Sequence, residues 1–278
     1  MAVITGAAGG IGRGMAETFA AAGMKLVLSD VDGPALEAAA SALRAAGAEV
    51  HAVAADVSKP EQVEGLARET IAKFGAVHVL CNNAGVFVGG EASWTKSLEE
   101  WDWVLGINLM GVVHGVRSFL PLMIAQDSEA HIVNTASLGG LVTGGSVLYG
   151  ASKFAVVGLS ENLREELQSR GLKPKVSVLC PGFVNTGILA NSRRRRPEGF
   201  VESGPPQSAE EEKRMAGLRQ AAAEALKQAL DPRAVGEQVL AAIRAERFYI
   251  LTHPELNPTI KRRAREMLRR PGWGGIFG

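Results

Sequence analysis

Short runs of β-branched and other apolar residues alternate with longer alanine-rich segments through most of this 278-residue chain. The segments between the runs have the length and composition of amphipathic helices. A repeated strand, helix, strand order implies right-handed crossovers and parallel strands covered by helices on both faces. The alternation therefore predicts an α/β fold, a doubly wound parallel sheet in a three-layer α/β/α sandwich. The runs read AVIT, KLVLSD, EVHAVAAD, VHVLCNNAG, HIVNTAS and KVSVLCPG.

The alternation breaks between about residues 186 and 231, where charged residues, Gly and Pro predominate. We expect an excursion from the sheet there, carrying one or two helices. Beyond it, ERFYILTH has the pattern of a last strand, and a basic helix with a glycine-rich tail is expected at about 258–278. Because we find no internal repeat and no clear linker, residues 1–278 are expected to form a single domain.

Charge and composition narrow the classes of function. The chain has 30 basic and 29 acidic residues, a formal net charge of +1, so it lacks a global field that would attract nucleic acid or an acidic membrane. No stretch approaches the roughly 20 apolar residues of a membrane span, and the N-terminus lacks a signal peptide. Cys81 and Cys180, without CxxC spacing, are expected to be buried thiols. These features predict a cytoplasmic protein acting on small molecules, without nucleic acid, membrane or metal.

A glycine-rich segment, TGAAGGIG at residues 5–12, follows the first predicted strand and precedes a helix. Glycines there let a pyrophosphate approach the backbone, and the helix N-terminus favours its negative charge. The second strand ends in Asp30, eighteen residues after Gly12. A carboxylate at that place can accept hydrogen bonds from both ribose hydroxyls of an adenosine. The alternative, a structural turn plus an ordinary surface aspartate, is less favoured by this context.

With these residues the chain resembles a short-chain dehydrogenase/reductase of the single-domain type. Its glycine pattern is similar to the family's T-G-x-x-x-G-I-G, Asp56-Val57 resembles the adenine-contacting pair, and Asn82-Asn83-Ala84-Gly85 resembles the N-N-A-G motif. The resemblance implies a Rossmann-like dinucleotide-binding and catalytic domain over 1–278. The cofactor-binding residues that it implies are Gly6, Gly10, Ile11, Gly12, Asp30, Asp56, Val57, Asn83, Ala84, Gly85, Tyr149, Lys153, Pro181, Gly182, Val184 and Thr186.

The stretch YGASK places Tyr149 and Lys153 four residues apart on a predicted helix. Residues i and i+4 share a helix face, so the ammonium can lie near the phenol. A nearby positive charge favours the phenolate, and we expect it to lower the pKa of Tyr149 toward neutrality, where the phenol can exchange protons with an alcohol or ketone. Such pairs also arise by chance, but the cofactor motifs favour the acid–base interpretation.

Two further residues complete the implied catalytic set. Ser137 resembles the family's serine that hydrogen-bonds the substrate oxygen, and Asn108 the asparagine that supports a proton path from the lysine. Their structural alternatives are a cap at the strand end and a satisfied helix amide. Ser152, next to Lys153, is expected to point elsewhere and receives no role. Eleven residues separate Ser137 from Tyr149, one fewer than is commonest in the family, so the intervening loop should be slightly tighter.

The resemblance implies hydride transfer between a nicotinamide and a secondary alcohol or ketone. Tyr149 would be the general base or acid, with Lys153 tuning it and binding the nicotinamide ribose. Apolar loops favour a hydrophobic or aromatic substrate, and some segments are similar to bacterial members that oxidise the benzylic alcohol of lignin-derived aryl ethers. The alternatives are an NADP-dependent carbonyl reductase and a catalytically silent NAD-binding sensor or scaffold.

Asp30 also predicts the cofactor. A 2′-phosphate beside this carboxylate would be repelled unless a cation intervened, and Gly9 and Val31 occupy the positions where family members that use NADP carry a basic residue. Arg13 is less well placed, so NAD should be preferred over NADP by about 100-fold. Residues 193–196, all arginine, are interpreted as a solvated loop face before an anionic-substrate site. A homo-oligomer, a tetramer or else a dimer, is expected because family members usually pair the helix that carries YGASK and the long helix before it, which is predicted around Glu99 to Gln126.

Overall fold

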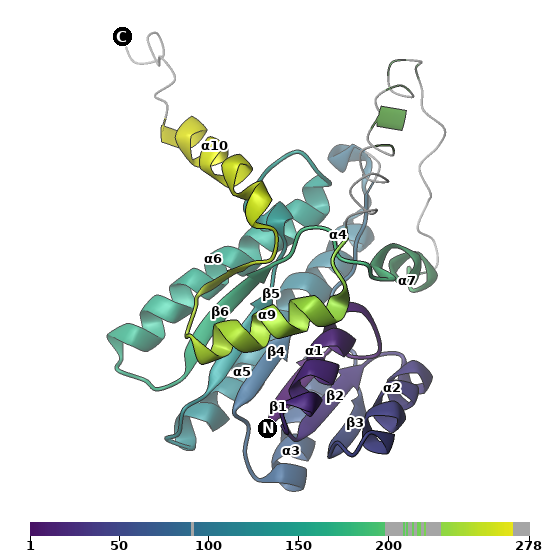
Figure 1. Cartoon of the computed structure of the whole chain (residues 1–278). Coiled ribbons are helices and arrows are strands. Elements are labelled where there is room, and N and C mark those ends of the chain that lie inside the picture. The colour runs from purple at the N-terminus through teal and green to yellow at the C-terminus, as the bar shows by residue number, and fades with distance from the viewer. Residues whose placement is uncertain are drawn as a thin grey trace.

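The computed structural model describes residues 1–89, 92–197 and 229–268, with isolated positions between 208 and 220. Within these residues, seven strands form one parallel sheet in the order β3-β2-β1-β4-β5-β6-β7 (Figure 1). The predicted doubly wound parallel sheet is confirmed. The strands are β1 Ala2–Thr5, β2 Leu26–Asp30, β3 Val50–Ala54, β4 Val79–Asn82, β5 His131–Thr135, β6 Lys175–Cys180 and β7 Tyr249–Leu251.

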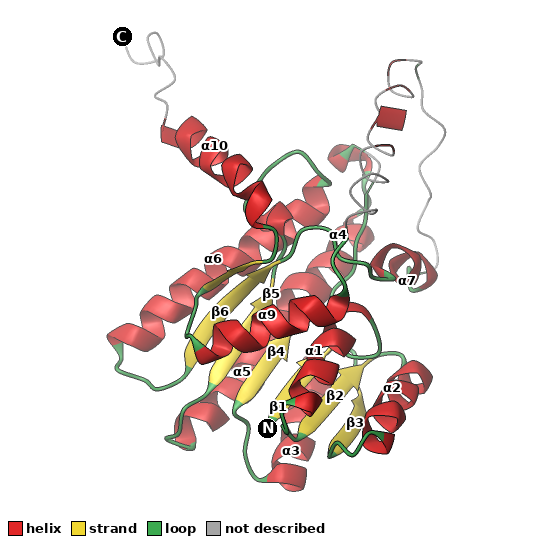
Figure 2. Cartoon of the chain, viewed as in Figure 1, coloured by secondary structure: helices red, strands yellow, loops and turns green. Residues whose placement is uncertain are grey.

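Helices cover both faces of the sheet, as Figure 2 shows. Successive strand residues point to opposite faces, so Ala2 and Ile4 pack in one core while Val3 packs in the other. The first core lies under α1, α2 and α9, and the second under α3, α5 and α6. The bounds are α1 Gly10–Ala21, α2 Gly33–Ala45, α3 Pro60–Phe74, α4 Leu98–Leu105, α5 Gly111–Ala125, α6 Val147–Ser169, α7 Ile188–Arg194, α9 Pro232–Arg244 and α10 Asn257–Leu268.

The order of strands changes direction at β1. From β1 the chain moves to β2 and then β3 on one side, whereas β4 pairs with the other edge of β1. The crossovers on the two sides therefore diverge and leave a crevice beyond the carboxyl ends of β1 and β4. Open α/β sheets bind ligands at such a switch point.

A side-chain cap fixes where the helix carrying Tyr149 begins. Ser146 accepts a hydrogen bond from the Tyr149 backbone N–H at 3.3 Å, which satisfies one of the free donors at the start of α6. The cap places Tyr149 in the first turn of α6 and Lys153 one turn later. Both side chains are thereby positioned beside the carboxyl end of the sheet.

The predicted long helix is present but is not uniform. It runs through α4, a π-helical stretch at Gly106–Met110, and α5. By length and composition alone, Leu98–Ala125 is long and apolar enough to cross a membrane, since an 18-residue window within it has a mean hydropathy of 1.4. This corrects our expectation that no stretch approaches a span. Phe119 and Met123 of this helix are fully buried against the sheet, so its apolar character is that of a core helix.

The segments after β6 agree with the sequence pattern where the structure describes them. One helix, α7, follows Thr186, the predicted last strand is β7, and α10 is a basic helix that projects away from the sheet (Figure 1). The rest of the predicted excursion, apart from the isolated positions, and the glycine-rich tail at 269–278 lie outside the described residues. Cys81 and Cys180 are buried free thiols, as predicted.

Candidate active site

The glycine-rich segment forms a tight turn between β1 and α1. Gly6 and Gly10 have φ angles of 66° and 52°, which residues with a Cβ rarely adopt. A Cβ at Gly12 would lie 2.1 Å from the carbonyl oxygen of Gly6, so the first turn of α1 packs directly on the loop. The turn therefore leaves its backbone, without side chains, at the N-terminus of a helix, which is the arrangement that a phosphate group requires.

A cavity of about 800 Å³ lies at the carboxyl ends of the strands. It extends from the β2–α2 turn, across the glycine-rich loop, to the first turns of α6. Thirteen of the sixteen predicted cofactor residues line it: Gly6, Gly10, Ile11, Asp30, Asp56, Val57, Asn83, Ala84, Gly85, Tyr149, Lys153, Pro181 and Thr186.

Gly12, Gly182 and Val184 do not line this cavity. Gly12 lies behind the loop. The Gly182 backbone N–H is directed at Thr252 Oγ1, 3.3 Å away, and at His253 Nδ1, 3.2 Å away. Val184 is buried in a bridge to the segment before α9. These residues support the walls of the cavity. No sequence pattern indicated that residues after β7 would hold Gly182.

The side chain of Asn83 is fixed from two strands. Its amide nitrogen donates to the carbonyl oxygen of Thr5 at 3.0 Å, and its amide oxygen accepts from Thr135 Oγ1 at 3.3 Å. Thr5 Oγ1 in turn accepts from the backbone N–H groups of Asn83 and Ala84, at 2.9 and 3.1 Å. The loop after β4 is thus held against the glycine-rich loop at the centre of the cavity.

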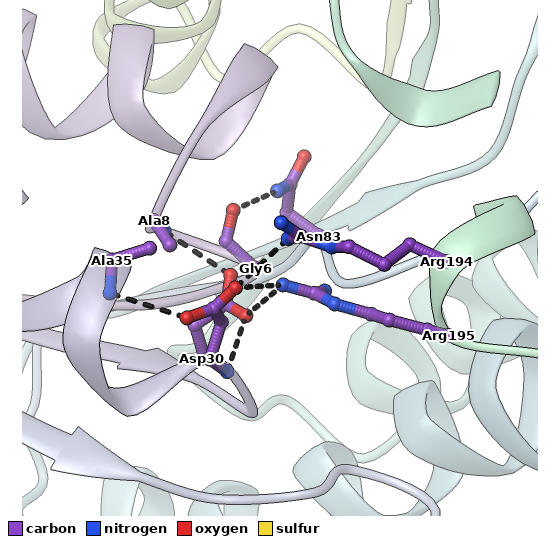
Figure 3. Close-up of polar contacts among 8 residues, drawn as sticks. Gly6, Ala8, Asp30, Ala35, Asn83, Arg194 and Arg195 are labelled. Atoms are coloured by element: carbon purple, nitrogen blue, oxygen red, sulfur yellow. Dashed lines mark hydrogen bonds and ion pairs between the residues drawn. The ribbon is translucent and has the colours of Figure 1, made fainter. Parts of the chain in front are cut away.

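Asp30 lies at the outer end of the cavity and is 8% exposed. Its carboxylate accepts from the backbone N–H groups of Ala8 and Asp32, each at 3.1 Å. Figure 3 shows two arginines reaching this end from α7 and the residue after it. Arg195 Nη2 lies 3.3 Å from Asp30 Oδ1 and 3.2 Å from Asp32 Oδ2, and Arg194 Nη2 lies 3.0 Å from Asp32 Oδ2.

These ion pairs correct two expectations. The sequence favours a solvated loop face for residues 193–196, but Arg194 and Arg195 pair with carboxylates on the cavity wall. We also expected no well-placed cation near Asp30, and Arg195 is such a cation. Arg13, the cation considered from the sequence, pairs instead with Glu17 at 2.9 Å. The hydrogen bond from Ala35 N–H, followed by that from Arg195, lowers the pKa of Asp32 below its usual value.

Tyr149 lies at the inner end of the cavity beside an aromatic neighbour. The Phe87 and Tyr149 ring centroids are 5.0 Å apart, tilted by 59°. Burial raises the pKa of Tyr149, and a side-chain hydrogen bond with Ser137 acts in the opposite direction. Our prediction that Lys153 lowers the pKa of Tyr149 toward neutrality is therefore wrong for the chain without cofactor, because the loss of hydration on burial outweighs the hydrogen bond with Ser137. Phe87 was not singled out in the sequence.

Lys153 is buried one turn further along α6. Its Nζ donates to the Thr135 carbonyl oxygen at 3.0 Å and lies 5.6 Å from the Tyr149 ring centroid. Burial lowers the pKa of Lys153 to about 8. Ser137, at the end of β5, accepts from the Gly139 N–H at 3.1 Å and caps a short 3-10 helix, Leu138–Gly140. The structure therefore brings Ser137, Tyr149 and Lys153 together, while giving Ser137 the capping contact that was its structural alternative.

Asn108 lies in the π-helical stretch and is fully buried. Its side-chain oxygen accepts from the Val86 N–H at 2.8 Å, and its amide nitrogen donates to the Val86 carbonyl oxygen at 3.0 Å. The same nitrogen donates to Ser152 Oγ at 3.1 Å. A Cβ at Gly85 would lie 3.3 Å from Asn108 Oδ1 and 3.5 Å from Lys153 Nζ, so both polar groups flank this glycine.

Ser152 corrects another expectation. It does not point away from the site but contacts Asn108, and its hydroxyl donates to the Tyr149 carbonyl oxygen at 2.7 Å. Because Ser152 is adjacent to Lys153, we expected its side chain to point elsewhere. Its i, i+3 spacing from Tyr149 instead places that side chain near the helix face of Tyr149.

The chain is similar to known proteins over most of its length. Residues 1–197 match the family model described as short chain dehydrogenase. A CLA biosynthesis dehydrogenase/reductase of Lactiplantibacillus plantarum is 38% identical over 266 residues, covering 95% of this chain and 92% of that protein. A C alpha-dehydrogenase of Sphingobium sp. strain SYK-6 is 34% identical, covering 94% and 83%. A short chain dehydrogenase/reductase from Burkholderia phymatum, solved in complex with NAD, is 46% identical with a TM-score of 0.87, covering 97% and 95%.

Proposed function

Because the chain belongs to the short-chain dehydrogenase family, we propose that it is an NAD-dependent oxidoreductase that interconverts a secondary alcohol and a ketone. One observation carries the proposal. A single cavity joins Asp30 and the glycine-rich loop at one end to Tyr149 and Lys153 at the other. A dinucleotide lying along this cavity would have its adenosine ribose beside Asp30 and its nicotinamide beside Tyr149.

The residues present fit such a cofactor. The glycine-rich loop offers a bare backbone and a helix N-terminus to the pyrophosphate, and Asp30 can accept hydrogen bonds from ribose hydroxyls. Lys153 would bind the nicotinamide ribose. When bound, the cofactor supplies the hydride acceptor or donor. The protein supplies the placement of the substrate and the transfer of its hydroxyl proton.

Tyr149 is assigned the proton transfer. With its pKa raised by burial, the phenol of the cofactor-free chain stays protonated at neutral pH, the form that donates a proton during ketone reduction. For alcohol oxidation the phenol must lose its proton, and the nearby Lys153 ammonium favours the phenolate in that step. Ser137 orients the substrate oxygen, and Asn108 supports proton relay by holding the backbone of Val86.

A hydrophobic or aromatic substrate is favoured by apolar residues in the cavity wall. Val86, Trp103, Ile107 and Ile188 line the cavity with apolar side chains. The ring of Phe87 beside Tyr149 adds an aromatic surface. Such walls offer dispersion contacts to an apolar substrate and few hydrogen-bond partners to a free sugar. The relatives from L. plantarum and Sphingobium, both named as dehydrogenases, support the reaction class.

NAD is the proposed cofactor over NADP. Asp30 is suited to ribose hydroxyls, and the Burkholderia relative was solved with NAD. Formation of NADH or NADPH should be followed by near-ultraviolet absorbance with aliphatic, aryl and steroid alcohols. Turnover with NAD and an aryl or other apolar secondary alcohol is expected. Better use of NADP would favour the carbonyl reductase alternative, and tight NADH binding without turnover of any alcohol would favour the sensor.

A further inference from the structure

Two arginines bring positive charge to the adenosine end of the cavity from a segment far away in sequence. Arg195 lies between the carboxylates of Asp30 and Asp32, and Arg194 pairs with Asp32. Figure 3 shows Arg195 beside Asp30. Arg195 is the less exposed arginine, with 29% of its side chain accessible against 65% for Arg194. The side chain of Asp30 is only 7% accessible, so the Arg195–Asp30 pair is little screened by solvent.

The segment that carries these arginines is anchored over the cavity at two further points. A Cβ at Gly10 would lie 3.1 Å from Thr186 Cγ2, so the start of the segment touches the glycine-rich loop. In its middle, Ser192 Oγ accepts from the Phe87 N–H at 2.9 Å. Ser192 is 2% exposed. The packing of α7 therefore holds both arginines at the adenosine end of the cavity.

We propose that Arg195, assisted by Arg194, is a cofactor-specificity residue that makes the adenosine end tolerant of a 2′-phosphate. This role rests on the proposed nicotinamide cofactor. Asp30 alone would repel a 2′-phosphate, whereas a guanidinium within 3.3 Å of it offsets that charge and can donate to phosphate oxygens. Both effects act on NADP, while NAD, which has a neutral hydroxyl at that place, gains little from either.

This assignment changes the size of the expected cofactor preference. The 100-fold preference for NAD applies to an Asp30 carboxylate that has no cation beside it. With Arg195 in place we expect the affinity for NAD to exceed that for NADP by only about 10-fold. In Arg195→Ala the preference should widen to about 100-fold, because NADP loses affinity while the affinity for NAD changes little.

Binding measurements test the proposal without turnover. AMP and adenosine 2′,5′-bisphosphate should be titrated calorimetrically into the full chain, its Arg195→Ala variant and its Arg193→Ala variant. Arg193 is exposed in α7, two residues before Arg195, so its replacement removes the same charge from the same segment. Arg195→Ala should weaken the bisphosphate about 10-fold and leave AMP within about 2-fold, while Arg193→Ala should change neither.

Three outcomes would overturn the proposal: unchanged bisphosphate affinity in Arg195→Ala, an equal loss for AMP and the bisphosphate, or an equal loss in Arg193→Ala. The second would show that the ion pairs only hold α7 in place. Steady-state kcat/KM for NAD and NADP should show the same widening. If no alcohol is turned over, the proposed oxidoreductase activity fails, but the two titrations still decide the role of Arg195.

Discussion

The side-chain nitrogen of Asn108 donates a 3.1 Å hydrogen bond to the hydroxyl of Ser152, two residues that both have no exposed surface. Asn108 comes from the helix before β5 and Ser152 from the helix after it. The bond ties the residue that holds the Val86 backbone to the turn of α6 between Tyr149 and Lys153. Ser152 is therefore a positioning residue for the proposed chemistry.

Replacing Ser152 with Ala should reduce turnover. Without the hydroxyl, one donor of the buried Asn108 amide loses its acceptor, at a typical cost of about 1–3 kcal/mol. We expect kcat to fall by about 10-fold while NADH affinity changes little, because Ser152 does not line the cavity. Steady-state kinetics and NADH fluorescence titration measure the two quantities.

Ser160→Ala is the matched control. Ser160 is also fully buried on α6, donates to the Val156 carbonyl oxygen at 2.7 Å and accepts from Asn134 at 3.0 Å, but contacts neither Asn108 nor Tyr149. Its loss should lower thermal stability by a similar amount without a specific fall in kcat. Equal kinetic losses in the two variants would show that Ser152 acts only on stability.

Tyr149→Phe should remove the proton carrier and leave the cofactor site formed. The ring keeps its place beside Phe87, and only the hydroxyl is lost. Turnover should fall by at least about 100-fold, the typical contribution of a general acid–base, while NADH affinity is maintained. Near-normal activity in this variant, measured with the substrate that the unmodified enzyme turns over best, would contradict the assignment.

Lys153 should make the stability of the cofactor-free protein depend on pH. Burial lowers its pKa from 10.5 to about 8, so between these values the unfolded chain binds a proton that the folded chain does not. The free energy of unfolding should therefore rise with pH across this window, by roughly 3 kcal/mol at most.

Lys153→Met isolates this contribution. Urea unfolding of both proteins at about pH 7.5 and about pH 9.5 should show the unmodified chain gaining stability relative to the variant as the pH rises. Tyr149, with its raised pKa, acts in the opposite direction only above about pH 10, where the unfolded tyrosine ionises first. A constant difference between the two proteins would mean that Lys153 keeps its ordinary pKa.

The chain should form a homo-oligomer through α5 and α6, with a tetramer expected and a dimer possible. Val116 and Leu120 on α5, and Leu159 and Leu163 on α6, are only partly buried. Light scattering should give a mass several times that of the chain, and Leu163→Glu should lower it. Met267→Glu, which adds the same charge on exposed α10, should not. A stable monomer at micromolar concentration would contradict this prediction.

The features that the sequence predicted correctly, the strands and the two motifs at their ends, depend on residues that are close together in the chain. β-branched runs specified the strands, and the TGAAGGIG and YGASK stretches are contiguous, so their position relative to strand ends was readable. The Arg195 contact was not readable, because it joins residues 163 positions apart at Asp32 and depends on how α7 packs. The pKa direction of Tyr149 was missed for the same reason, since burial is a property of the folded chain.

The π-helical stretch Gly106–Met110 has a consequence for how this helix can vary. A single π turn accommodates one surplus residue, so the α-helical parts before and after it keep the phase of their packing faces. A chain that lost one residue here could still seat Val104 and Phe119 in their cores, yet Asn108 would no longer face Val86 and Ser152. The loss of one residue at this point would therefore move Asn108 without disturbing the packing of the helix, so we expect a relative with a shorter helix to fold normally and to lack activity.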